Sequence, residues 1–209
     1  MQQPKPVPNP IALGITGASG ACYAVRLLRW LLHAGYPVQL VISKAGRLVL
    51  HQELDLALPA QPQAVAQVLH DYCAAPVGLL RVYGDQDWNA PLASGSGAPS
   101  ALVIVPCTVG TLGAVAHGLS DNLLHRAADV CLKERRKLIL VVRETPFSAI
   151  HLQNMLTLSH AGAIILPANP GFYHRPTGLT DVVDFIVARI LDQLQLPHQL
   201  LPRWGATPE

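Results

Sequence analysis

Five short apolar runs, each ending at a cluster of small or polar residues, constrain the fold of this chain more than any other feature. Each run has four or five residues, and stretches long enough to contain a helix separate the runs. Such runs are typical of strands buried on both faces of a parallel sheet, which helices must then cover. We therefore expect buried parallel strands at residues 11–15, 38–42, 102–105, 138–142 and 163–166.

Helical patterns fill the intervals between these runs. The apolar spacing predicts helices at residues 20–33, 45–53, 62–73, 110–117, 121–134, 148–160 and 180–194. An insertion before the third run holds a further short strand at 80–83 and a long loop at 88–99, which is either functional or a mobile surface excursion. This order predicts an α/β fold: a doubly wound, open parallel sheet of the flavodoxin-like or Rossmann-like kind, arranged as a three-layer sandwich.

The composition describes an apolar chain of one-domain size. Of the 209 residues, 50% are hydrophobic and only 13% are charged. No apolar run approaches the roughly 18 residues that span a bilayer, so we expect no membrane segment and interpret the apolar excess as surface covered in a homo-oligomer. The formal net charge is +2 and the basic residues are scattered, which predicts no nucleic-acid site.

The cysteines and histidines show no metal-ligand spacing. Four cysteines form no C-x-x-C pair and nine histidines do not cluster, so we predict no metal. Free cysteines of this kind are typical of a reduced, cytoplasmic protein. Residues 1–10 lack the apolar core of a signal peptide and are expected to form a flexible tail.

The chemistry is expected beyond the carboxyl ends of the strands, where open parallel sheets bind ligands. The first turn does not have the G-x-G-x-x-G spacing of dinucleotide sites, because its glycines stand at 14, 17 and 20. The second run ends in Ser43-Lys44 and not in an acidic residue, which disfavours NAD. Lys44 and Arg47 leave NADP open, whereas no P-loop pattern occurs.

A second polar turn, from Thr108 to Thr111, follows the third run and opens a helix. Its hydroxyls and backbone N–H groups suit a phosphate monoester, although ordinary helix capping also explains Thr108. The two turns together, at neighbouring strand ends, favour a ligand of the size of flavin mononucleotide (FMN).

Four charged residues are further candidates. Arg126 and Lys133 share one face of the helix at 121–134, where they either hold a second phosphate or form a solvated face. Glu144 follows Arg143 at the end of a buried strand, so it is either ion-paired or placed for proton transfer. Arg189 borders apolar surface on the last helix and requires an anionic partner.

Six motifs resemble those of the UbiX flavin prenyltransferases: T-G-A-S-G at 16–20, S-K at 43–44, P-C-T-V-G-T-L at 106–112, R-A-A-D-V-C-L-K-E-R-R at 126–136, R-E-T-P at 143–146 and G-F-Y-H-R-P at 171–176. The resemblance runs from about residue 11 to P-R-W at 202–204. Two positions depart from the pattern: Thr108 stands where many relatives have serine, and Lys137, expected at the surface, where proline is frequent.

The resemblance implies a metal-independent prenyltransferase. Such enzymes transfer a dimethylallyl group from dimethylallyl phosphate to N5 and C6 of reduced FMN. The product, prenylated FMN, is the cofactor of UbiD-type decarboxylases, so a decarboxylase of that type is an expected partner. The family also implies a homo-oligomer, a dodecamer. Three alternatives are a non-catalytic flavin carrier, a flavin-dependent cysteine decarboxylase, whose turn after the third strand carries asparagine, and an NADP-dependent reductase.

The resemblance also assigns roles to residues. The catalytic residues would be Ser19, Glu53, Lys133, Glu144 and Tyr173. FMN would be held by Gly17, Ala18, Ser19, Ser43, Thr108, Val109, Gly110, Thr111 and Arg143. The prenyl donor would be held by Arg126, Lys133, Tyr173, Arg189 and Trp204. Residues 11–195 would form a single flavin-binding domain, and the tail at 196–209 would contribute to the active site or to a subunit interface.

Overall fold

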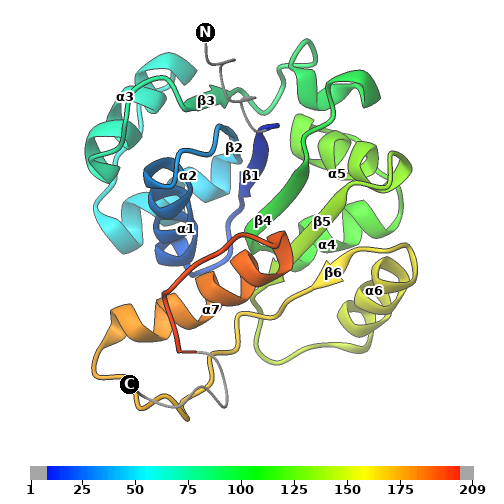
Figure 1. Cartoon of the computed structure of the whole chain (residues 1–209). Helices are drawn as coiled ribbons and strands as arrows, with labels where there is room; N and C mark the ends of the chain where they lie inside the picture. Colours follow the sequence, from blue (N-terminus) through cyan, green and yellow to red (C-terminus); the bar gives the residue numbers. More distant parts are fainter. Residues whose placement is uncertain (1–8, 203–209) are drawn as a thin grey trace, which may run out of the picture.

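Six parallel strands form the central sheet of the protein, which a computed structural model describes for residues 9–202. The strands are β1 (Ile11–Ile15), β2 (Val38–Ile42), β3 (Leu80–Tyr83), β4 (Ala101–Cys107), β5 (Lys137–Val142) and β6 (Ile164–Ile165). Their order in the sheet is β3-β2-β1-β4-β5-β6 (Figure 1). The predicted doubly wound parallel sheet is confirmed, and its order is the Rossmann-like one.

In the described part of the chain, seven α-helices cover both faces of the sheet and complete the three layers. They are α1 (Ala21–His33), α2 (Lys44–Leu54), α3 (Pro62–Cys73), α4 (Val109–Ala116), α5 (Leu123–Lys133), α6 (Ala149–His160) and α7 (Leu179–Leu194). One core packs α1, α2, α3 and α7 against the sheet, and the other packs α4, α5 and α6 against the opposite face (Figure 1). Within residues 9–202, no helix has the length and apolarity needed to cross a membrane.

Alternation along the strands explains why the runs are apolar almost throughout, with Gln39 of β2 as a polar exception. Leu13 and Ile15 of β1 enter the first core, and Ala12 enters the second, so each strand needs apolar residues on both sides. The exception is β6, which has only two residues and is half-buried. It lies last in the sheet and has one neighbouring strand, so the expected four-residue buried strand there is wrong.

Strand β4 continues through Pro106, although the sequence predicts that it ends before this residue. Proline has no N–H to donate, but the Pro106 carbonyl accepts hydrogen bonds from the Thr16 N–H (3.3 Å) and from the Thr16 hydroxyl (2.7 Å). The Thr108 N–H in turn donates to Thr16 Oγ1 (2.9 Å). The hydroxyl of Thr16 therefore joins the carboxyl ends of β1 and β4.

The insertion is packed structure. The strand expected at residues 80–83 pairs with β2 and extends the sheet. The loop at 88–99 contains two short 3-10 turns, Pro91–Ala93 and Gly95–Gly97, and Leu92 is buried in the core beneath α5. The loop thus forms part of the cover of α5.

Two contacts hold α7 in place, one to helix α1 and one to strand β5. Arg26 of α1 and Asp184 of α7 form a two-pronged ion pair, with Nε–Oδ1 and Nη2–Oδ2 distances of 2.6 and 2.9 Å. At the other end of the helix, Lys137 Nζ donates to the Gln193 carbonyl. Lys137 is half-buried at the start of β5, so its expected surface position is wrong.

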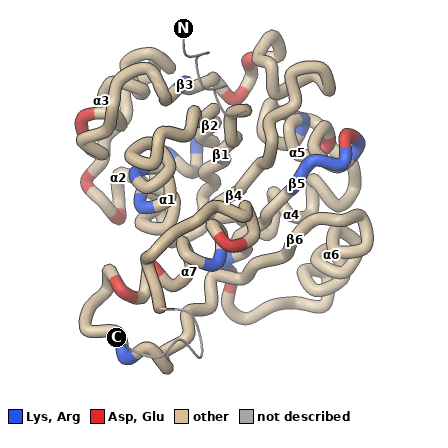
Figure 2. The backbone as a smooth tube through the Cα atoms, viewed as in Figure 1, with Lys and Arg blue, Asp and Glu red and all other residues tan. Residues whose placement is uncertain are grey.

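The charged residues follow the loops and helix ends more than any one face. Lys and Arg are spread over several elements, and their densest group lies at the turn between α5 and β5 (Figure 2). That turn holds Lys133, Arg135, Arg136 and Lys137. The predicted scatter of basic residues is therefore also found in space.

Candidate active site

The carboxyl ends of the strands form a rim with a switch point between β1 and β4. The helix that follows β1 packs on one face of the sheet, and the helix that follows β4 packs on the other. Open α/β sheets bind ligands in the crevice at such a point, because the connecting segments diverge there. Thr16 and Thr108 lie on its two sides.

Helices α1, α2 and α4 all begin at this rim. Ser43 caps α2, since its Oγ accepts from the Gly46 N–H at 3.0 Å. Thr108 caps α4, since its Oγ1 accepts from the Thr111 N–H at 3.1 Å and also lies 3.0 Å from Thr111 Oγ1. The partial positive charge of helix N-termini favours a phosphate group at this position.

The first turn of α2 packs against the end of β1 with no room for side chains between them. A Cβ on Gly17 would lie 2.4 Å from the Ala45 Cβ, and a Cβ on Gly46 would lie 2.5 Å from the Ile15 carbonyl oxygen. Both distances are far below van der Waals contact. The two glycines therefore set the shape of the turn that borders the crevice.

Gly46→Ala is expected to lower the free energy of unfolding by about 1–3 kcal/mol, because the added methyl group meets backbone atoms that cannot move aside. FMN affinity should fall as well, since α2 must shift away from β1. Urea denaturation and quenching of flavin fluorescence measure the two effects. Gly84→Ala is the control, because a Cβ at Gly84 meets nothing within 4 Å. Equal stability of the two variants would contradict the close approach.

Glu53, in the last turn of α2, closes the N-terminus of α1. Its carboxylate accepts hydrogen bonds from the N–H groups of Gly20 (3.0 Å) and Ala21 (2.8 Å). Gly20 has a φ of 113°, a left-handed conformation that suits glycine, and this value lets the turn direct both N–H groups at Glu53. The carboxylate thus takes the place of a helix-capping side chain.

The charge state of Glu53 follows from these contacts. Partial burial raises the pKa of its carboxyl group. Hydrogen bonds from the Ser19 side chain and from the N–H groups of Gly20 and Ala21, together with the charge of Arg143, lower the pKa by more than burial raises it. The net pKa lies below the ordinary value for glutamate. Glu53 is therefore an ionised base at neutral pH.

Arg143 and Glu144 extend the rim beyond β5. The Arg143 N–H donates to the Cys107 carbonyl at 3.2 Å, which holds the residue beside the end of β4. Within residues 9–202, the buried Arg143 Nε has no hydrogen-bond partner. Buried donors are almost always satisfied, so this nitrogen points to an acceptor on a bound ligand. The neighbouring Glu144 is half-buried, and its Oε1 accepts from the Thr145 N–H.

The Tyr173 ring, from the loop before α7, and Arg189 of α7 lie along one stripe of that helix. The Tyr173 ring contacts Phe185 edge-on, with centroids 6.0 Å apart. Phe185 and Arg189 are one helical turn apart, so the Tyr173 ring and the Arg189 guanidinium follow the same side of the helix. The two residues are 66% and 51% exposed. A second molecule or a ligand has access to both.

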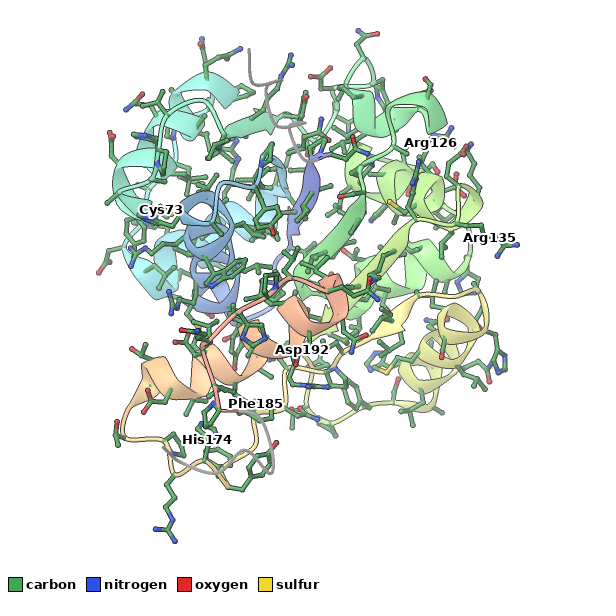
Figure 3. The ribbon with its side chains drawn as sticks, in the orientation of Figure 1. Cys73, Arg126, Arg135, His174, Phe185 and Asp192 are labelled. Carbon is green, nitrogen blue, oxygen red and sulfur yellow. The ribbon has the colours of Figure 1, made fainter. Side chains whose placement is uncertain are left out.

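Arg126 and Lys133 are not brought to this rim within one chain. Arg126 donates to the Ala93 carbonyl (3.0 Å) and pairs with Asp129, and Lys133 pairs with Glu134. Helix α5 leads into the N-terminal end of β5, so Lys133 lies near the sheet edge opposite to the rim. Figure 3 shows Arg126 well apart from Phe185. Trp204 lies outside the described residues.

Comparisons with known proteins decide the family. The Flavoprotein family model matches residues 2–191. The curated flavin prenyltransferase UbiX of Pseudomonas aeruginosa is 59% identical over 198 residues, which are 95% of each chain. The chain belongs to the flavin prenyltransferase family. The expectation from its six motifs is confirmed, and a cysteine decarboxylase or a reductase is not favoured.

Solved structures agree with this placement. The structure of AnUbiX (PadA1) in complex with FMN and dimethylallyl pyrophosphate has a TM-score of 0.85 and 36% identity, covering 96% of this chain and all of its own. A dodecameric FMN-dependent UbiX-like decarboxylase from Escherichia coli O157:H7 has a TM-score of 0.80 and 37% identity, covering 94% and 99%. The flavin prenyltransferase fold therefore extends over nearly the whole chain.

The rim of this flavin prenyltransferase fits FMN. The hydroxyl groups of Ser43, Thr108 and Thr111, with the first N–H groups of α4 from Val109 and Gly110, suit the phosphate. The Arg143 guanidinium, with its unsatisfied Nε, suits the polar edge of the flavin. Gly17 and Ala18 border the crevice at the end of β1. Within the described residues, no three potential metal ligands stand close enough to hold an ion.

The sequence interpretation missed one residue of the site. Thr16 is 2% exposed and links the two strands of the switch point, a role that its motif alone does not predict. The available signal was its place: a hydroxyl residue directly after a buried strand, where the next buried strand ends in a proline.

Proposed function

We propose that the protein transfers a dimethylallyl group from dimethylallyl phosphate to N5 and C6 of reduced FMN and releases prenylated FMN. One observation carries this proposal: the Glu53 carboxylate, which accepts hydrogen bonds from the Gly20 and Ala21 N–H groups, lies close enough to Arg143 for the arginine charge to lower its pKa. The AnUbiX complex with FMN and dimethylallyl pyrophosphate supports the substrate pair. No metal takes part in the proposed reaction.

Each residue of the rim has a role in the proposed reaction. Bound reduced FMN supplies the nucleophilic N5 and C6. The Tyr173 hydroxyl and the Arg189 guanidinium stabilise the negative charge that the phosphate gains as the allylic C–O bond breaks. Glu53, with Ser19, accepts the proton from N5, and either Glu144 or the departing phosphate accepts the proton from C6. Exclusion of water protects the allylic cation from hydrolysis.

A second copy of the chain completes the donor site in this proposal. Arg126 and Lys133 lie away from the rim in their own chain, whereas Tyr173 and Arg189 are exposed and accessible to a neighbour. The dodecameric relative from Escherichia coli supports an oligomer, and we propose a dodecamer. We propose that the tail at residues 196–209 contributes to the active site or to a subunit interface of the flavin-binding domain at residues 11–195.

Mixing two inactive variants tests the shared site. Lys133→Ala and Arg189→Ala chains, unfolded together and refolded as mixed oligomers, are expected to regain about a quarter of the wild-type activity. The reason is that some sites then receive Lys133 from one chain and Arg189 from the other. Mixing chains that both carry Lys133→Ala is the control. Activity that does not rise above that of the separate variants would place both residues in one chain's site.

An anaerobic assay tests the function itself. The protein is mixed with reduced FMN and either dimethylallyl monophosphate or diphosphate, and mass spectrometry follows the flavin. We expect a flavin heavier by one C5 prenyl unit with at least one donor. A non-catalytic flavin carrier, the second candidate, would bind FMN and leave its mass unchanged, but the placement of Tyr173 and Arg189 on one stripe has no use in a carrier.

We further propose that the product serves a UbiD-type decarboxylase in the cytoplasm. Adding the reaction mixture to such a decarboxylase without its cofactor should restore decarboxylation. The same mixture prepared without the prenyl donor should restore none.

A further inference from the structure

We propose that Asp192 and His198 are positioning residues that hold the Arg189 guanidinium ready for the phosphate of the prenyl donor. The inference rests on the proposed role of Arg189. Three side chains form the chain of contacts that carries it. Asp192 lies between the other two and contacts each with a different oxygen.

The contacts define one arrangement of protons. Arg189 Nη1 donates to Asp192 Oδ2 at 2.7 Å, and His198 Nε2 lies 3.1 Å from Asp192 Oδ1. The Leu200 N–H donates to His198 Nδ1 at 3.4 Å, so Nδ1 is the acceptor nitrogen of the ring. The proton of a neutral His198 is then on Nε2, from which it donates to Asp192. This arrangement needs no charge on the imidazole.

Burial decreases from His198 outward. The side chains of His198, Asp192 and Arg189 are 8%, 34% and 51% exposed. An isolated Arg–Asp pair on a helix surface is weak, because two long side chains must be ordered in water. Here the buried imidazole fixes the carboxylate first, so the guanidinium is ordered against a partner that is already immobile. The exposed end of the chain of contacts is the end that meets the ligand.

The arrangement leaves most of the guanidinium available. Within residues 9–202, Asp192 is its only hydrogen-bond partner, through Nη1. Guanidinium has five N–H donors in a planar fork, and fixing one side of the fork aims the rest. Arg189 lines a cavity of about 340 Å³ between β6 and α7, together with Asn169 and Phe185. The Tyr173 ring packs against Phe185, so both residues proposed to bind the phosphate, Tyr173 and Arg189, adjoin this cavity.

Two substitutions test the positioning role. Asp192→Asn is expected to raise the dissociation constant and the KM of dimethylallyl phosphate about tenfold and to leave FMN affinity unchanged. His198→Leu should have a smaller effect of the same kind, of about threefold to tenfold. His198→Gln should keep the dissociation constant and the KM of the wild type, because the glutamine amide nitrogen replaces Nε2 as the donor to Asp192. Calorimetry with oxidised FMN bound measures donor affinity without turnover.

Asp184→Asn is the matched control. Asp184 lies on α7, as Asp192 does, and it also pairs with an arginine, Arg26 of α1, at a similar distance of 2.6 Å. This variant should lose stability in urea and keep the wild-type dissociation constant for the donor. A rise in the donor constant equal to that of Asp192→Asn would mean that general loosening of α7 causes the effect, and would overturn the inference.

The Arg189→Ala background separates the two levels of the proposal. There, Asp192→Asn should cause no further loss of donor affinity, since Asp192 acts through Arg189. If Arg189→Ala weakens the donor but Asp192→Asn does not, or strengthens it, the positioning role fails and the role of Arg189 stands. If Arg189→Ala leaves the donor constant unchanged, the proposed role of Arg189 fails and the positioning role fails with it.

Discussion

Glu53→Gln is expected to lower kcat about 100- to 10,000-fold and to leave FMN bound, which single-turnover assays and flavin titration measure. Glutamine keeps an oxygen that accepts hydrogen bonds from the Gly20 and Ala21 N–H groups, so the N-terminus of α1 stays closed. It removes the negative charge and the basicity that the proposed proton transfer needs. The loss should therefore appear in the chemical step.

The pH dependence of the wild-type enzyme provides a second test of the same residue. The pKa of Glu53 is lowered, so its carboxylate takes up a proton only when the pH falls below the ordinary range for glutamate. The acid limb of the rate should lie there and should be absent from Glu53→Gln. Asp55→Asn, which removes an exposed carboxylate just after α2, is the control and should behave as wild type. A rate that is unchanged by Glu53→Gln would remove this residue from the reaction.

Arg189→Ala is expected to lower kcat/KM for the prenyl donor about 30- to 1,000-fold, which corresponds to about 2–4 kcal/mol of transition-state stabilisation. The guanidinium is half-exposed on α7 and its ion-pair partner, Asp192, holds one of its nitrogens. Its other N–H groups are available to an anion that forms next to the Tyr173 ring. FMN affinity should not change, because the proposed flavin site lies at the ends of β1, β2, β4 and β5.

An arginine at this site could bind the prenyl donor or FMN. Steady-state kinetics with varied prenyl donor measure the first role, and a separate flavin titration measures the second. Arg189→Lys should recover part of the activity, because it restores the charge without the planar fork. Arg81→Ala, at an exposed arginine on the edge strand β3, is the charge-matched control. Loss of flavin from Arg189→Ala would assign Arg189 to the cofactor and contradict the proposed division of the site.

Buried strands were the part of the fold that the sequence predicted best. A strand of mostly apolar residues is stable only where both of its faces are covered by other parts of the protein. Strands β1, β2, β4 and β5 meet this condition. Edge positions were harder to predict, because they depend on the number of neighbouring strands. The short β6 and the pairing of β3 with β2 are set by contacts that local patterns do not contain.

The site shows the same division. The polar turn at Thr108 was predicted because a helix after a buried strand begins at the rim of a parallel sheet. Glu53 had no such signal, since the N–H groups that it accepts from are 32 and 33 residues away and belong to another helix. Only the family resemblance pointed to it. Lys137 was misjudged because the carbonyl that it contacts is 56 residues away.

The hydrogen bonds from the start of α1 to Glu53 link the protonation of this residue to the structure of the turn beside the crevice. The carboxylate that we propose as the base is also the anion that accepts hydrogen bonds from the first backbone N–H groups of α1. Each proton that the base takes up weakens this clasp, because a neutral carboxyl accepts less strongly. The two hydrogen bonds that close α1 should therefore be strongest before the proton transfer and weaker after it, while the flavin stays bound.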